Sequence, residues 1–112
     1  MSQGLFIFLF SRNYVVQYVI GMKVPHVTSN IIVQLGGSYV TLSMSKYGSN
    51  VVEKCLKDTG EEHSARIITE IMHHPDFLKV LQDPYGNYVV QSALNASKVI
   101  LLHSSFLGFS YA

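Results

Sequence analysis

The sequence predicts an all-α protein built from repeated helical units, an α-solenoid. Three segments are variants of one template: NYVVQ at 13–17, SNVVE at 49–53 and NYVVQ at 87–91. Their first residues lie 36 and 38 residues apart, and such a period is typical of helical repeat arrays. Around each copy the apolar residues recur at helical spacing, and no alternation typical of β-strands competes with it. We therefore expect stacked repeats and not a single globular core.

Length and composition agree with this fold class and limit the function. The chain of 112 residues has room for about three repeats, and its hydrophobic content of 48% is enough for a packed core. Its net charge of +1 leaves no general basic surface, so a nucleic acid would be held mainly through its bases. The longest purely apolar run, residues 5–10, is far shorter than the roughly 20 residues that span a bilayer, so we expect no membrane partner.

The first repeat is expected to contain two amphipathic helices. Residues 13–20 form the first, because their apolar side chains fall on one helix face, and Gly21 follows as a stop. Pro25 opens the second, which ends at Gly36. A short helix or turn is expected over residues 38–44.

The second repeat is expected to contain a motif helix over residues 48–57, which ends before Gly60, and a long helix over residues 61–73. In the third repeat we expect a short helix over residues 77–81 and the last motif helix over residues 85–95. The repeating unit is therefore a short helix, a motif helix and a longer closing helix.

The two ends of the chain differ from the repeats. Residues 1–11 carry a β-prone apolar run, and residues 99–112 are almost uncharged and lack the period of a closing helix. We therefore divide the chain into an atypical first segment, a partial array and an atypical tail: 1–11, 12–98 (units 12–37, 38–75 and 76–98) and 99–112. Our hypothesis is that both ends are foreign to the array, as translated intron sequence or a truncated gene model would be. Genuine terminal caps of unusual composition are the alternative, and continuous messenger RNA coverage would favour them.

The template carries side chains that suit nucleobases. In the first copy, Asn13 and Gln17 are four residues apart and hence neighbours on a helix, while Tyr14 points away from the apolar stripe. Two amides offer the donor and the acceptor that match the edge of uracil. In the second copy Ser49 and Glu53 replace them, and a carboxylate accepts two N–H bonds, which suits guanine.

A polar pair of this spacing usually marks a solvated helix face. Three copies in register, each with the same two valines and a flat or amide side chain pointing outward, favour binding instead. The candidate nucleic-acid-binding residues are Asn13, Tyr14, Gln17, Ser49, Asn50, Glu53, Asn87, Tyr88 and Gln91.

These segments resemble the repeats of the Pumilio (PUF) family, in which one base is recognised per repeat. Residues 46–55 and 83–91 match the base-recognition helices of that family nearly residue for residue, and the resemblance covers about residues 12–98. The order of the three pairs is similar to that in the last three of the family's eight repeats. The resemblance implies about two and a half Pumilio-type three-helix repeats.

The resemblance also implies a role for each candidate residue. The pairs Asn13/Gln17, Ser49/Glu53 and Asn87/Gln91 would recognise uracil, guanine and uracil, and Tyr14, Asn50 and Tyr88 would stack on the bases. Because the RNA of this family runs antiparallel to the protein, the implied element is 5′-UGU-3′.

The implied partners are single-stranded messenger RNA, bound in its 3′ untranslated region, and regulatory proteins on the convex face. The implied outcome is control of translation or messenger RNA stability in the cytoplasm, with no cofactor and no enzymatic activity. The lone Cys55 fits an intracellular protein, because it cannot form an intrachain disulfide.

This chain also departs from the family pattern. Arg12 stands where the other copies have Gly48 and Gly86, a third closing helix is not recognisable, and about five upstream repeats are missing. Repeat arrays gain stability from neighbouring repeats, so we expect a marginally stable fragment with weak binding, micromolar at best.

Metal binding, nucleophilic catalysis and protein interaction are the alternatives to RNA binding. The five histidines show no spacing typical of a metal site, and Cys55 lies on an apolar stripe, where a packing thiol is expected rather than a nucleophile. The alternative function is a protein-interaction scaffold, or a truncated product without function. Replacement of Tyr14, Asn50 and Tyr88 by alanine would abolish RNA crosslinking in an RNA-binding protein and would leave partner capture intact in a scaffold.

Overall fold

The computed structural model describes residues 15–106, and in this range the chain is helical and contains no strand. The helices are α2 (Val15–Gly21), α3 (Pro25–Leu35), α4 (Tyr39–Ser43), α5 (Lys46–Asp58), α6 (Glu61–Met72), α7 (Phe77–Gln82) and α8 (Gly86–Phe106). The expected all-α repeat architecture is confirmed. Residues 1–11, Arg12, Asn13 and Tyr14 lie outside the described part of the chain, as do residues 107–112.

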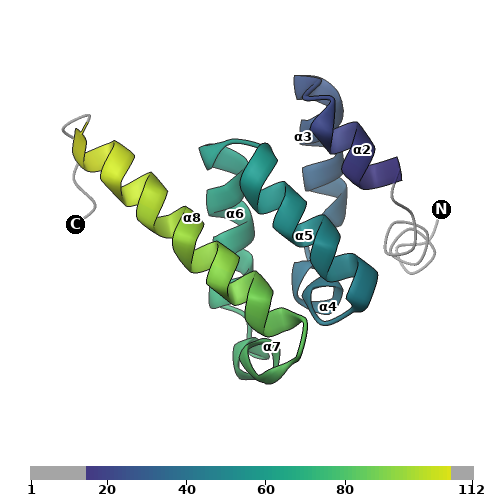
Figure 1. Ribbon diagram of the computed structural model, residues 1–112, viewed down its shortest axis with the longest axis vertical. Helices are drawn as coiled ribbons and strands as arrows, with labels where there is room; N and C mark the ends of the chain where they lie inside the picture. Colours follow the sequence, from purple (N-terminus) through teal and green to yellow (C-terminus); the bar gives the residue numbers. More distant parts are fainter. Residues whose placement is uncertain (1–14, 107–112) are drawn as a thin grey trace.

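The three motif helices form one layer. Helices α2, α5 and α8 slant in the same direction in Figure 1, with α3 and α6 behind them and the short α4 and α7 at one end. Helix α5 packs against both α2 and α8, and α6 packs against α5 and α8. Helix α5 therefore lies between the other two motif helices.

The core includes equivalent positions of the motif helices. Val51, Val52 and Cys55 of α5 are fully buried, and Val89 and Val90 of α8 are buried in the same way. These are the apolar positions of the template, and their burial away from the polar pair follows from the helical period.

A glycine near the start of α5 and α8 allows close packing of the preceding short helix. A Cβ atom on Gly48 would collide with the carbonyl oxygen of Leu42, and one on Gly86 would collide with the carbonyl oxygen of Val80. The repeated glycine before the polar pair is therefore required by a close backbone approach, and not by an unusual φ angle.

The starts of α5 and α8 are held by equivalent side chains. The backbone N–H of Gly48 donates to Ser45 Oγ at 3.0 Å, and the N–H of Gly86 donates to Asp83 Oδ2 at 2.9 Å. Each bond satisfies an amide that the helix itself leaves without a partner. The two caps, Ser45 and Asp83, are equivalent positions of the repeat, although α5 begins at Lys46 and α8 begins at Gly86, two residues later in the repeat.

The ends of α5 and α8 differ. The chain turns from α5 into α6 at Gly60, which has a φ of 92°, and this left-handed conformation favours glycine. Lys98 stands at the equivalent position of the third repeat, and α8 continues past it to Phe106. The last motif helix, expected over residues 85–95, is therefore longer than its sequence pattern indicated.

Candidate nucleic-acid interface

A hollow of about 260 Å³ lies between the second and third motif helices. We call it the α5–α8 hollow, and it is lined by Lys46, Ser49, Asn50, Glu53, Tyr85 and Tyr88. The predicted residues of the second copy therefore share one concavity with the predicted stacking residue of the third. Such a site combines a carboxylate, a hydroxyl, an amide and aromatic rings, which are the groups that bind the edge and the face of a base.

Ser49 lies deep in this hollow and is only 5% exposed. Its hydroxyl donates to the backbone carbonyl of Lys46 at 3.1 Å. The hydroxyl proton is therefore used within the helix, and the Ser49 oxygen keeps its capacity to accept a hydrogen bond. At this depth Ser49 can contact only a group that enters the hollow.

Glu53 is half-buried on the same side of α5. One of its oxygens, Oε1, accepts a hydrogen bond from Ser92 Oγ of α8 at 2.9 Å. A carboxylate has about four acceptor positions, so one bond leaves the group able to accept further N–H donors. The side chain is therefore anchored and still available to a ligand.

The planar side chains of the hollow reach toward solvent. Asn50 is exposed, and Tyr88 is 60% exposed although it is a large aromatic residue. An aromatic ring with this exposure does not stabilise the core, and it can offer its face to a stacked base. Asn50 belongs to α5 and Tyr88 to α8, so each of these two neighbouring helices contributes one planar side chain to the hollow.

The polar pair of the third copy forms the contact that its spacing predicts. Gln91 Nε2 donates to Asn87 Oδ1 at 2.8 Å on the surface of α8. This bond leaves the Asn87 amide N–H groups as donors and Gln91 Oε1 as an acceptor. The pair thus presents a donor beside an acceptor, the combination that complements the uracil edge.

The first copy is described only in part. Gln17 is half-buried on α2, which packs against α5. Asn13 and Tyr14 lie outside the described residues, so the assignment of this copy stays a prediction.

Sequence reasoning did not identify Lys46 and Tyr85, which line the α5–α8 hollow. Lys46 also lies over the ring of Tyr47, with its Nζ atom 5.6 Å from the ring centroid. Tyr47 and Tyr85 each precede a polar pair by two residues. This repeated tyrosine is the sequence signal that could have identified Tyr85 as a residue of the hollow.

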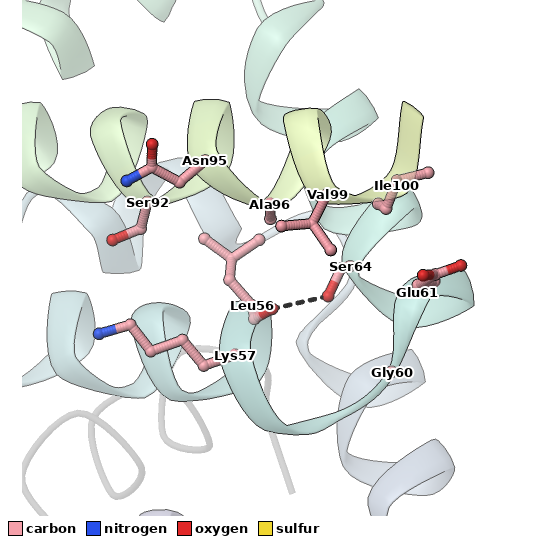
Figure 2. Close-up of a pocket in the computed structure, with 10 residues that line it drawn as sticks. All are labelled: Leu56, Lys57, Gly60, Glu61, Ser64, Ser92, Asn95, Ala96, Val99 and Ile100. Atoms are coloured by element: carbon pink, nitrogen blue, oxygen red, sulfur yellow. Dashed lines mark hydrogen bonds between the residues drawn. The ribbon is translucent and has the colours of Figure 1, made fainter. Parts of the chain in front are cut away.

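A second hollow of about 430 Å³ lies farther along the same helices, between α5, α6 and α8 (Figure 2). Its walls are mainly apolar near Leu56 and Val99, and the hydroxyl of Ser64 donates to the carbonyl of Leu56 at 2.8 Å. Ser92 of α8 lines this hollow and also donates a hydrogen bond to Glu53. We call this space the apolar hollow.

The remaining candidate groups behave as packing elements in the described range. Cys55 is fully buried, and burial raises the pKa of its thiol to about 12, so the reactive thiolate is scarce at neutral pH. Within residues 15–106 no group of three or more histidine, cysteine or acidic side chains could hold a metal ion. No helix of this part is long and apolar enough to cross a membrane.

Comparison with known proteins identifies the family of the chain. Residues 38–72 and 77–98 match the model of the Pumilio-family RNA binding repeat. Pumilio homolog 12 of Arabidopsis thaliana is 51% identical over 86 residues, which are 77% of this chain and 14% of that protein. Pumilio homolog 11 and Pumilio homolog 9 of the same plant are 48% and 44% identical over 77% of this chain, and each is covered over 15% of its own length.

The chain thus spans about one seventh of the length of the curated relatives that it matches. No solved structure matches it. The matched family model covers the second and third motif helices, which form the α5–α8 hollow. The chain therefore belongs to the Pumilio family of RNA-binding repeat proteins.

Proposed function

We propose that this chain binds single-stranded RNA through the edges and faces of consecutive bases, one base per repeat. The observation that carries this proposal is the α5–α8 hollow, which brings the carboxylate of Glu53 and the ring of Tyr88 to one concave site. A net charge of only +1 supports recognition through bases, because few cations are available for the phosphate backbone.

The element that fits the three pairs is 5′-UGU-3′. Glu53, with Ser49 beside it, recognises guanine, because its carboxylate accepts the N1–H and N2–H groups of that base and repels the carbonyl oxygens of uracil. The Asn87/Gln91 pair recognises one uracil and the Asn13/Gln17 pair the other. Tyr14, Asn50 and Tyr88 stack on the bases.

The proposed targets are 3′ untranslated regions of messenger RNA, and the proposed outcome is control of translation or messenger RNA stability. Membership of the Pumilio family supports this part of the proposal. We also propose a cytoplasmic location, because messenger RNA is translated and degraded in the cytoplasm. Regulatory proteins would then bind the convex face, opposite the RNA.

The affinity of the isolated chain for RNA is expected to be weak. Stacking contributes on the order of 1–3 kcal/mol per base, and three bases therefore contribute at most about 9 kcal/mol. Association costs roughly 4–15 kcal/mol in lost translational and rotational freedom. Stacking therefore leaves at most about 5 kcal/mol after association, and hydrogen bonds to the base edges bring the expected dissociation constant to micromolar at best. Nanomolar binding of a UGU oligomer would contradict this expectation.

The decisive experiment exchanges the second pair for the pair of its neighbours. In the double variant Ser49→Asn, Glu53→Gln, the preferred central base should change from guanine to uracil, because the carboxylate is replaced by an amide that offers a donor. The measurement is fluorescence anisotropy with labelled UGU, UUU and GGU oligomers, so that both the central base and the first base are varied. A matched exchange at Asn87 and Gln91, to Ser and Glu, should move the preference at the first base and leave the central one unchanged. A central preference that stays on guanine in the first variant would refute the assigned roles.

A further inference from the structure

A hydrogen bond joins the proposed guanine-recognition carboxylate to the next repeat. Ser92 Oγ of α8 donates to Glu53 Oε1 of α5 at 2.9 Å, and the two residues are 39 positions apart in the sequence. Both side chains are half-buried. Ser92 is not part of the repeated polar pair or of the stacking position, and it does not line the α5–α8 hollow.

Ser92 approaches the carboxylate from outside the proposed base site. It lines the apolar hollow together with Leu56 and Asn95, and Figure 2 shows its side chain on the side of α8 that faces α5. Glu53 lines the α5–α8 hollow instead. The hydroxyl therefore contacts Glu53 without occupying the space in which a base would lie.

This contact restricts the orientation of a flexible side chain. A free glutamate has several rotatable bonds, and holding it in one orientation costs conformational entropy at the moment of binding. A hydroxyl that donates to one carboxylate oxygen fixes that orientation before the ligand arrives, which is the usual gain from preorganisation. Hydrogen bonds to an ionised group are also stronger than those between neutral groups.

The bond leaves the acceptor capacity that guanine needs. Ser92 uses one acceptor position on Oε1, so Oε2 and a second position on Oε1 stay available for the N1–H and N2–H donors. A hydroxyl is also suited to this task because, unlike a lysine, it does not neutralise the carboxylate.

We propose that Ser92 is a positioning residue for guanine recognition, so that the third repeat helps to set the base preference of the second. This inference rests on the proposed function, in which Glu53 contacts the central guanine. It predicts that base preference in this chain depends on a residue that does not touch the base.

The test uses the full chain and the variant Ser92→Ala, with anisotropy measured for UGU, UUU and an oligomer with inosine at the centre. The ratio of UGU to UUU affinity should fall about threefold to tenfold, as expected for loss of one typical intramolecular hydrogen bond that acts only by orienting the carboxylate. The penalty for inosine, which lacks the N2 amino group, should shrink as well. Ser92→Thr keeps a hydroxyl and should restore both ratios.

Ser97→Ala is the matched control on the same helix. Ser97 Oγ donates to the carbonyl of Ala93 within α8 at 2.9 Å and has no contact with Glu53, so its loss should leave the base ratios unchanged. In a Glu53→Ala background, Ser92→Ala should have no further effect on the ratios, because its acceptor is gone.

The outcomes separate this inference from the proposed function. A wild-type chain without any preference for guanine would refute the proposed function, and the role of Ser92 with it. A wild-type preference that Ser92→Ala leaves intact, with all oligomers weakened equally, would refute only the role of Ser92. A residual effect of Ser92→Ala in the Glu53→Ala background would refute it too.

Discussion

At the scale of single residues, the environment of a template position depends on the helix that follows it. Leu56 of α5 is 4% exposed, whereas Leu94, the equivalent residue of α8, is 50% exposed. The equivalent residues Ser49 and Asn87 also differ in exposure, since Ser49 of α5 is buried and Asn87 of α8 is half-buried. Helix α8 covers α5, and within the described range no later helix covers α8. The same motif therefore forms a hollow in one repeat and an open surface in the next.

Cys55 provides a prediction for pH dependence at this scale. Burial raises the pKa of its thiol from the ordinary value of 9.0 to about 12, so the folded protein keeps a proton that the unfolded chain releases above pH 9. Stability from this group is complete below pH 9 and is lost as the pH rises toward 12. By pH 10 the loss should be about 1.4 kcal/mol.

The measurement is urea unfolding of the wild-type chain and of Cys55→Ala at pH 7.5 and pH 10. Burial also raises the pKa of Tyr39, with a smaller contribution from Cys55, so the part that is due to burial is common to both proteins and cancels in the comparison. The alanine variant should be less stable at neutral pH and should lose less stability on going to pH 10. Equal losses in the two proteins would show that the thiol is not responsible.

Contacts between residues of the same helix can be predicted from the sequence. The Gln91–Asn87 bond joins residues four positions apart, and the buried stripe of Val51, Val52 and Cys55 follows from the helical period. The Ser92–Glu53 bond and the two bonds from Gly37 and Tyr39 N–H to Glu70 join residues more than 30 positions apart. Such contacts depend on how helices pack, and local spacing carries no information on them.

At the scale of elements, helix starts were easier to predict than the end of the last helix. The boundaries of α5, α6 and α7 lie within two residues of those expected from capping and breaking residues. The apolar period of the motif ends near Asn95, so it predicts a shorter α8 than the one that extends to Phe106. Lys98 stands at the position of Gly60, and a positive φ costs a lysine more than a glycine, although Lys23 adopts a φ of 57° between α2 and α3; Lys98 therefore favours a continuing helix without requiring it.

The glycine at the start of a motif helix gives the prediction at this scale. Gly86→Ala should destabilise the fold by about 1–3 kcal/mol, because the added methyl group collides with the Val80 carbonyl and pushes α7 away from α8. Gly21→Ala is the matched control. A Cβ atom there meets only the Lys54 side chain, at an ordinary 3.6 Å, and alanine favours the helix.

Thermal or urea unfolding of the two glycine variants checks this prediction. The control should be neutral or stabilised by up to about 1 kcal/mol. Equal effects of the two substitutions would mean that helix propensity, and not the contact between α7 and α8, explains the repeated glycine.

At the scale of the whole molecule, stability comes from contacts between neighbouring repeats. Helix α5 has motif helices on both sides, whereas α2 and α8 form the two ends of the layer in the described structure (Figure 1). In a repeat array each interface adds a nearest-neighbour term, so an end helix with one neighbour is less stable than a central one. Exposed Val99, Leu101 and Leu102 on α8 agree with this position at an end.

Completion of the third repeat should therefore stabilise the chain. In the chimera that we propose, Lys98 becomes glycine and a copy of residues 61–72 replaces everything after it, so that the chain turns after α8 as it does after α5. The new helix should cover Leu94 as α6 and α8 cover Leu56, and burial of about half a leucine side chain contributes on the order of 1 kcal/mol. The packed helix adds its own interface to this gain.

A chimera of equal length that keeps Lys98 is the matched control, since it supplies the same apolar residues without the glycine that adopts a positive φ in the turn after α5. Urea unfolding should show a higher midpoint for the glycine chimera than for the control. UGU affinity should also rise in the glycine chimera, because the Asn87/Gln91 pair would be held on a helix with two supporting layers. If both chimeras unfold at the same midpoint, the end of α8 is not determined by the residue at position 98, and the contrast between Gly60 and Lys98 does not account for the different ends of these two helices.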